Sequence, residues 1–201
     1  MTSDDRNAEV DYMYKTLTET RQSALYLQEQ LKGNRASAQY PPDTLGGDLR
    51  TVSNLILSGC DTRVYYLSLT GFDTHVNQRN THQRLLKNVS DGLASFVKEM
   101  RENSLMQDVT ILCFSEFGRR VKQNASGGTD HGAGNNLFMI SEHLQVPGFF
   151  NPVPDLRILD EGDIPYTVDF RNVYADILQQ WLDVRPDVIL GQGMEPLGLL
   201  G

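Results

Sequence analysis

Three short clusters of ionisable residues carry the side chains best suited to chemistry. They are Gly71–His75 (Gly-Phe-Asp-Thr-His), Ser115–Arg120 (Ser-Glu-Phe-Gly-Arg-Arg) and Gly128–Gly132 (Gly-Thr-Asp-His-Gly). Each cluster follows, or lies between, segments that read as regular structure. Functional sites are often presented in this way, on loops held by a rigid scaffold. The candidate site is therefore expected in these three loops.

The first and third clusters combine carboxylates with imidazoles, which are common ligands of metal ions. Asp73 and His75 are two residues apart, so on an extended loop their side chains point the same way. Such a pair is half of a zinc or manganese site, with calcium as a further alternative. Asp130 and His131 are adjacent, so either both bind the ion or one orients the other.

The second cluster adds a carboxylate and two guanidinium groups. Glu116 is interpreted as a metal ligand or a general base, and Arg119 as the group that orients a substrate oxyanion, with Arg120 as additional positive charge. Simpler interpretations stay open. Asp73 could only cap the following helix, and Glu116 could only form an ordinary surface ion pair with Arg119.

The segments around the clusters predict an α/β fold. Apolar residues spaced by three and four predict helices, and short apolar runs predict buried strands. Strand, loop, helix and strand in succession are typical of a mostly parallel sheet flanked by helices, with its site at the carboxyl ends of the strands. The expected helices are 4–32 (amphipathic), 44–57, 81–103 and 170–182, and the expected strands are 63–69, 109–114 and 136–141.

Length and charge limit the classes of function. A chain of 201 residues is long enough for one domain with a sizeable core, or at most two small ones, and a single α/β domain over residues 1–201 is expected. The net charge of −8, without a cluster of Lys and Arg, argues against nucleic acid as a partner. A small anionic substrate stays compatible with that charge, because it responds to the local field of a cleft and of any metal. A protein partner is also open. No apolar run approaches the length of a transmembrane helix, about 20 residues.

The clusters also resemble a known family. Gly71–His75, Phe114–Arg120, Gly128–Gly132 and Thr167–Tyr174 resemble, in that order, the signature blocks of the bacterial domain-of-unknown-function family 1501. The resemblance covers residues 45–184, between an amino-terminal helix and linker (1–44) and a tail (185–201). That family looks like a branch of the alkaline phosphatase and sulfatase superfamily. The resemblance implies an alkaline-phosphatase-like fold that lacks its amino-terminal part, and a protein exported to the periplasm.

The superfamily resemblance also implies roles for single residues. Asp73 and His75 match its first metal-binding pair, and His131 matches its late metal-binding histidine. Residues 115–118 occupy the place of a Ser-Asp-His-Gly turn, but Phe117 stands where that turn has a histidine. The second metal of the superfamily would therefore lose a ligand. The nucleophile and its strand are expected to lie outside this chain, so the site is predicted to be incomplete.

Two functions from different classes follow. The first is a metal-dependent hydrolase of phosphate or sulfate esters, with metal ligands among Asp73, His75, Glu116, Asp130 and His131. The second is a non-catalytic binding or surface-assembly protein that retains the sulfatase-like fold. The density of carboxylates and histidines favours the first function, whereas Phe117 and the missing nucleophile favour the second.

Overall fold

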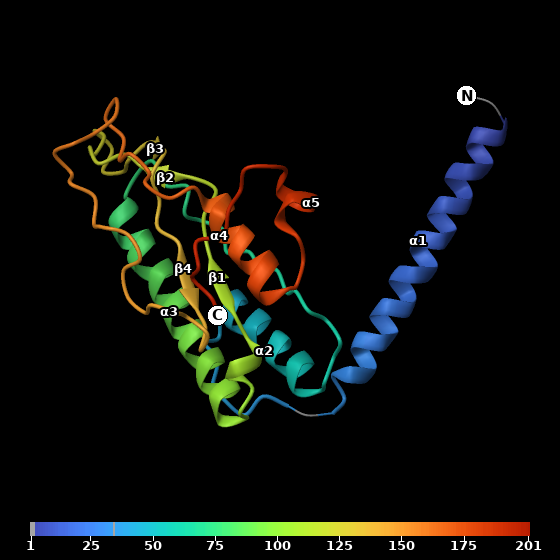
Figure 1. Cartoon of the computed structure of the whole chain (residues 1–201). Coiled ribbons are helices and arrows are strands. Elements are labelled where there is room, and N and C mark those ends of the chain that lie inside the picture. Colours follow the sequence, from blue (N-terminus) through green and yellow to red (C-terminus); the bar gives the residue numbers. More distant parts are fainter. Residues whose placement is uncertain (1–2, 34) are drawn as a thin grey trace. The chain divides into compact units, whose positions relative to one another are not determined.

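The fold was analysed in a computed structural model, which describes residues 3–33 and 35–201, with the side chains of the first helix described from Glu9 onward. Figure 1 shows the elements in chain order. The helical elements are α1 (Ser3–Gln30), α2 (Thr44–Leu57), α3 (Gln78–Glu102), η1 (Met106–Asp108), α4 (Phe170–Asp176), η2 (Ile177–Trp181) and α5 (Pro186–Leu190). The strands are β1 (Ile111–Cys113), β2 (Gly118–Arg119), β3 (His131–Gly132) and β4 (Phe138–Ile140).

The chain forms two compact units. The first consists of the chain up to Leu69 together with Lys87–Asn103, and the second consists of Thr70–Leu86 together with Ser104–Gly201. All the candidate site residues belong to the second unit. The helices expected at 44–57 and 81–103 are confirmed, the first with identical bounds and the second with bounds within three residues.

Capping and an apolar face explain α2 and its packing in the first unit. The Asp43 side chain accepts a hydrogen bond from the Gly46 main-chain N–H at 2.8 Å, and Gly59, just past the helix, has a φ of 74°. Leu49 and Val52 are buried on the apolar face of α2. A Cβ at Gly92 would lie 2.9 Å from the Leu49 Cδ1 atom, so the absence of a side chain at Gly92 lets α3 approach α2 closely.

The same unit contains a buried carboxylate. The Glu99 side chain, on α3, is 1% exposed. It accepts hydrogen bonds from the main-chain N–H groups of Ser37 and Ala38, at 3.1 and 2.5 Å, and from the Asn103 side chain at 3.1 Å. Burial opposes ionisation of this carboxyl, but these hydrogen bonds outweigh it and lower the pKa of Glu99. Glu99 thus fixes the segment before α2 to α3.

The second unit contains two small antiparallel sheets, so the predicted, mostly parallel sheet flanked by helices is wrong. Strand β1 pairs with β4, with Leu112 opposite Met139, and β2 pairs with β3, with Arg119 opposite His131. The alkaline-phosphatase-like fold expected from the resemblance is contradicted by the same finding. The apolar runs at 109–114 and 136–141 do contain strands. Their composition predicts a strand but not the direction in which its partner runs.

The strand expected at 63–69 is also wrong. Its side chains alternate between partly buried and exposed, as in an extended chain, but the segment pairs with no strand in residues 3–33 and 35–201. Val64 is 66% exposed and Tyr66 is 75% exposed, so the segment is not a buried strand. An extended segment becomes part of a sheet only where a neighbour supplies hydrogen bonds, and its own composition cannot provide one.

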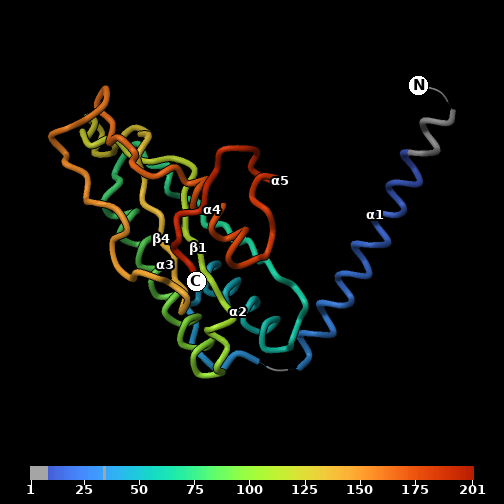
Figure 2. Tube along the Cα trace, viewed as in Figure 1, coloured from blue at the N-terminus to red at the C-terminus, as the bar shows by residue number. Residues whose placement is uncertain are grey.

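The carboxyl-terminal part combines a loop with short helices. Figure 2 follows the chain beyond β4 through residues 141–169, which form turns and isolated bridges. The Asp169 carboxylate then caps α4, accepting a hydrogen bond from the Arg171 main-chain N–H at 2.9 Å. The helix expected at 170–182 begins as α4 and continues as the π-helical turn η2. The tail, residues 185–201, contains α5.

The first helix is confirmed, but its apolar residues are not buried. Tyr12 is 71% exposed, Met13 61% and Leu17 63%. The spacing of these residues correctly predicted a helix, yet these three side chains lie largely in solvent. None of the helices in residues 3–33 and 35–201 is long and apolar enough to span a membrane, in agreement with the sequence.

Candidate metal centre

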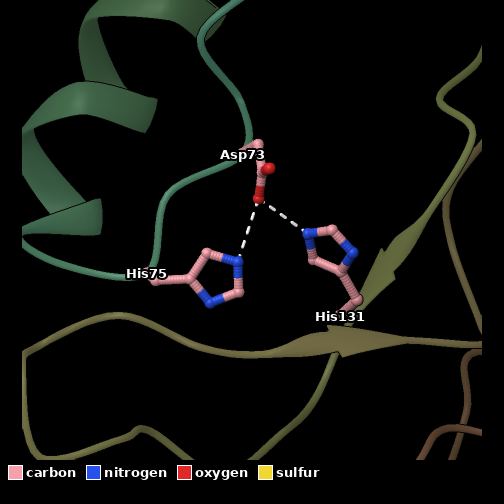
Figure 3. A group of neighbouring side chains, drawn as sticks. All are labelled: Asp73, His75 and His131. Carbon is pink, nitrogen blue, oxygen red and sulfur yellow. Dashed lines mark hydrogen bonds and ion pairs between the residues drawn. The ribbon is translucent and has the colours of Figure 1, made fainter.

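Three predicted site residues come together around one oxygen atom. Asp73 and His75 lie on the loop that precedes α3, and His131 is the first residue of β3 (Figure 3). The Oδ1 atom of Asp73 is 3.0 Å from His75 Nε2 and 2.7 Å from His131 Nε2. One potential ligand atom from each residue lies within 4.8 Å of the other two. Two imidazole nitrogens and one carboxylate oxygen are a donor set that zinc and manganese accept.

Asp130 contacts His75 on the side of the imidazole ring opposite Asp73. Its Oδ1 atom is 3.3 Å from His75 Nδ1, the ring nitrogen that faces away from Asp73. A carboxylate that accepts the Nδ1–H proton leaves the Nε2 lone pair of His75 free for a metal ion. Of the two alternatives for Asp130, the geometry favours the orienting role, although it orients His75 and not its neighbour His131.

Main-chain hydrogen bonds join the two loops that carry the cluster. The N–H groups of Asn77 and Gln78 donate to the carbonyl oxygens of Ser126 and Gly127, at 3.2 and 3.1 Å. A Cβ at Gly128 would lie 2.3 Å from the carbonyl carbon of His75, closer than any real Cβ contact. Only glycine fits there, so Gly128 allows the backbones of the two loops to touch.

Asn124 supports the same contact. Its side-chain oxygen accepts hydrogen bonds from the main-chain N–H groups of Ser126 and Gly128, both at 3.0 Å, which closes the turn between them. Its amide group donates to the carbonyl oxygen of His75 at 2.9 Å. A single side chain therefore shapes one loop and binds the other, a role that the polar composition of this turn did not single out.

The cluster is open to solvent and charged. The side chains of Asp73 and His131 are 60% and 45% exposed. The hydrogen bond from His131, aided by the positive charge that both imidazoles carry when protonated, lowers the pKa of the Asp73 carboxyl. Exposed ion pairs of this kind contribute little to stability by themselves. The three side chains therefore add little to the stability of the fold, and their ligand atoms are accessible from the solvent.

Only part of the second predicted cluster, Ser115–Arg120, contacts this site. Glu116 is exposed and is not one of the three residues whose ligand atoms converge. Arg119 does reach the site, but its guanidinium donates to the main-chain carbonyl oxygens of Phe72, Thr74 and Thr129. The donors expected to hold a substrate oxyanion are thus directed at the protein itself.

A ring contact and two hydrogen-bond contacts of a further histidine lie next to the cluster. The Phe117 ring stacks on the His131 ring, with centroids 3.9 Å apart and planes 10° apart. The Nε2 atom of His82 lies 2.8 Å from the Thr74 hydroxyl and 3.1 Å from the Phe72 carbonyl oxygen. His82 therefore helps to hold the first loop. Its position within the apolar pattern of a helix gave no signal of this contact.

Comparison with known proteins identifies the family. The family described as "Protein of unknown function (DUF1501)" matches residues 14–140, more than half of the chain and all three clusters. The chain belongs to the DUF1501 family. No curated protein and no solved structure matches the chain. The expected membership of this family is thereby confirmed, and membership of the DUF1501 family attaches no reaction to the three residues.

Proposed function

We propose that this DUF1501 chain binds one divalent metal ion, zinc or manganese, through Asp73, His75 and His131. The single observation that supports this proposal is the convergence of His75 Nε2 and His131 Nε2 on one oxygen of Asp73, at 3.0 and 2.7 Å. The three residues come from two loops separated by more than 50 positions in the sequence. Asp130 completes the arrangement as the carboxylate that orients His75.

We further propose that the metal centre serves hydrolysis of phosphate or sulfate esters. A divalent ion at this place would supply the Lewis acidity that ester hydrolysis needs. Three protein ligands on an exposed surface resemble catalytic sites, which keep a position open, more than structural sites, which are closed by four ligands. The substrate class rests on the resemblance to the alkaline phosphatase and sulfatase superfamily, as does export to the periplasm.

The roles of the chain's own residues follow from their surroundings. Asp73 and the two histidines would hold the ion, and Asp130, 3.3 Å from the Nδ1 atom of His75, would orient the ring so that its Nε2 atom faces the ion. Glu116, which is exposed and close in sequence to Phe117, is proposed as a general base and not as a ligand. We expect slow turnover by this chain alone, because no Ser, Thr or Cys in the described residues lies in a recognisable nucleophile motif.

The proposal is tested first by metal content. Plasma mass spectrometry of the purified chain, before and after mild chelation and readdition of zinc or manganese, is expected to give about one ion per chain. The His131→Ala variant is expected to give none. Absence of metal in the wild-type chain after readdition would contradict the proposal. Hydrolysis of p-nitrophenyl phosphate and p-nitrophenyl sulfate, with and without metal, then tests the substrate class.

A second candidate function is binding of a protein partner without catalysis. The observation that favours it is the exposed apolar surface of α1, where Tyr12, Met13 and Leu17 are all more than 60% exposed. Surfaces of this kind often mark interaction sites. Metal binding without any ester hydrolysis, together with self-association that a Leu17→Glu variant abolishes, would favour this function over the first.

A further inference from the structure

Arg119 occupies the point at which the two loops of the metal centre meet. Its Nη1 atom donates to the carbonyl oxygens of Thr74 and Thr129, at 3.0 and 2.6 Å, and its Nη2 atom donates to that of Phe72. Phe72 and Thr74 flank Asp73, whereas Thr129 precedes Asp130 and His131. One planar guanidinium thus spans both ligand-bearing loops. Its fork of fixed donors suits three acceptors that diverge in this way.

The same side chain also supports His131 from the side. The Arg119 Cζ atom lies 5.0 Å from the centre of the Phe117 ring, and that ring stacks on His131 at 3.9 Å. In the main chain, Arg119 is the partner of His131 in the pairing of β2 with β3. Arg119 is 18% exposed, whereas the ligand side chains are about half exposed. The Arg119 side chain is therefore largely buried beneath ligand side chains that are open to solvent.

We propose that Arg119 is a positioning residue: it sets the distance between the loop of Asp73 and His75 and the loop of His131, and so determines the affinity of the site for its metal ion. This inference rests on the metal site proposed above. It replaces the expected role of Arg119 in holding a substrate oxyanion, because three of its donors are already used by carbonyl oxygens.

Charge and geometry predict opposite effects of removing Arg119. The Nη2 atom is 3.9 Å from Asp73 Oδ1, so its positive charge repels a cation bound by Asp73. If charge alone mattered, a neutral residue at position 119 would tighten metal binding. If positioning matters, loss of the three hydrogen bonds would loosen both loops and weaken binding, although a repulsive charge has been removed.

The experiment is a titration of the full chain with Co²⁺, followed by its visible absorption. The first variant is Arg119→Met, which removes both the positive charge and the planar set of N–H donors. The second is Arg119→Lys, which keeps the charge but loses the planar set of donors. We expect both variants to bind Co²⁺ about 10 to 100 times more weakly than wild type, with an altered visible spectrum. Arg120→Met is the matched control. Arg120 contacts Asp163 and the Glu161 carbonyl oxygen, and neither Asp73 nor the histidines, so wild-type affinity is expected.

A second measurement needs no metal. Hydrogen exchange of the Asn77 and Gln78 amides, which join the loops, is expected to be about ten times faster in both Arg119 variants than in wild type and Arg120→Met. Unchanged affinity together with unchanged exchange would overturn the positioning role, as would tighter binding by Arg119→Met. If wild type binds no Co²⁺, the metal proposal fails. Faster exchange in the variants would then still support Arg119 as the link between the loops.

Discussion

Two carboxylates, Glu99 in the first unit and Asp73 in the second, show opposite ways of using a negative charge. Glu99 is 1% exposed and accepts hydrogen bonds from groups of its own chain, so its carboxylate is not accessible to a ligand from solvent. The Asp73 side chain is 60% exposed, and one of its oxygens faces two histidines that could bind metal with it. The difference suggests that Glu99 stabilises the fold, whereas Asp73 belongs to a site.

Replacing a histidine that faces Asp73 is expected to have the largest effect. In His75→Ala the site loses one of its three proposed ligands. Replacing a residue that only supports a ligand typically lowers metal affinity about 10- to 100-fold, so loss of a ligand itself should lower the affinity for zinc or manganese at least about 100-fold. His143→Ala is the matched control. Isothermal titration of both variants checks the prediction, and equal affinity for metal in the two would remove His75 from the site.

Replacing Glu99 tests the other half of the comparison. Glu99→Ala leaves the N–H groups of Ser37 and Ala38 without their acceptor, so we expect the free energy of unfolding to fall by about 2–3 kcal/mol. Metal affinity should stay unchanged. Glu102→Ala is the control, because Glu102 forms an exposed ion pair with Lys98 at 3.7 Å, and it should change stability by less than about 0.5 kcal/mol. Urea denaturation measures both variants, and a Glu99 effect no larger than that of Glu102 would contradict the structural role.

The outer carboxylate of the site should have a smaller effect than its ligands. In Asp130→Asn, His75 loses the charged acceptor of its Nδ1–H group, so metal affinity should weaken about tenfold while one ion is still bound per chain. Glu116→Gln is the control and should keep wild-type affinity. A complete loss of metal in Asp130→Asn would instead mean that Asp130 is itself a ligand.

The smallest effect concerns the cap of α4. Hydrogen bonds from the Arg171 side chain and main-chain N–H lower the pKa of Asp169 to about 2. Because the folded-state pKa lies below the value of about 3.9 for an unfolded chain, the carboxylate stabilises the fold above that pH. Its contribution is lost as the pH falls toward 2. The stability difference between wild type and Asp169→Asn should therefore be constant above about pH 5 and shrink below pH 4 in acid titrations of unfolding. A difference that does not depend on pH would show that ionisation of Asp169 is unimportant.

Local signals predicted the main helices well. The apolar residues of α2 and α3 are spaced by three and four positions, so the sequence contains this signal directly. Asp73, His75, Asp130 and His131 were chosen as candidates because they are ionisable residues concentrated where the chain turns, and the structure places their side chains close together. Glu116 was chosen as a candidate for the same reason, but its side chain is exposed and does not belong to the group of converging ligand atoms.

The sequence by itself therefore determined where helices form and which loops carry carboxylates and imidazoles, because capping and periodicity act over a few residues. Only the tertiary structure decided that β1 pairs antiparallel with β4, that residues 63–69 gain no partner and that Arg119 binds three carbonyl oxygens. Each of these depends on a hydrogen-bond partner supplied by another part of the chain. The identity of that partner is not encoded in the residues on one side of the contact.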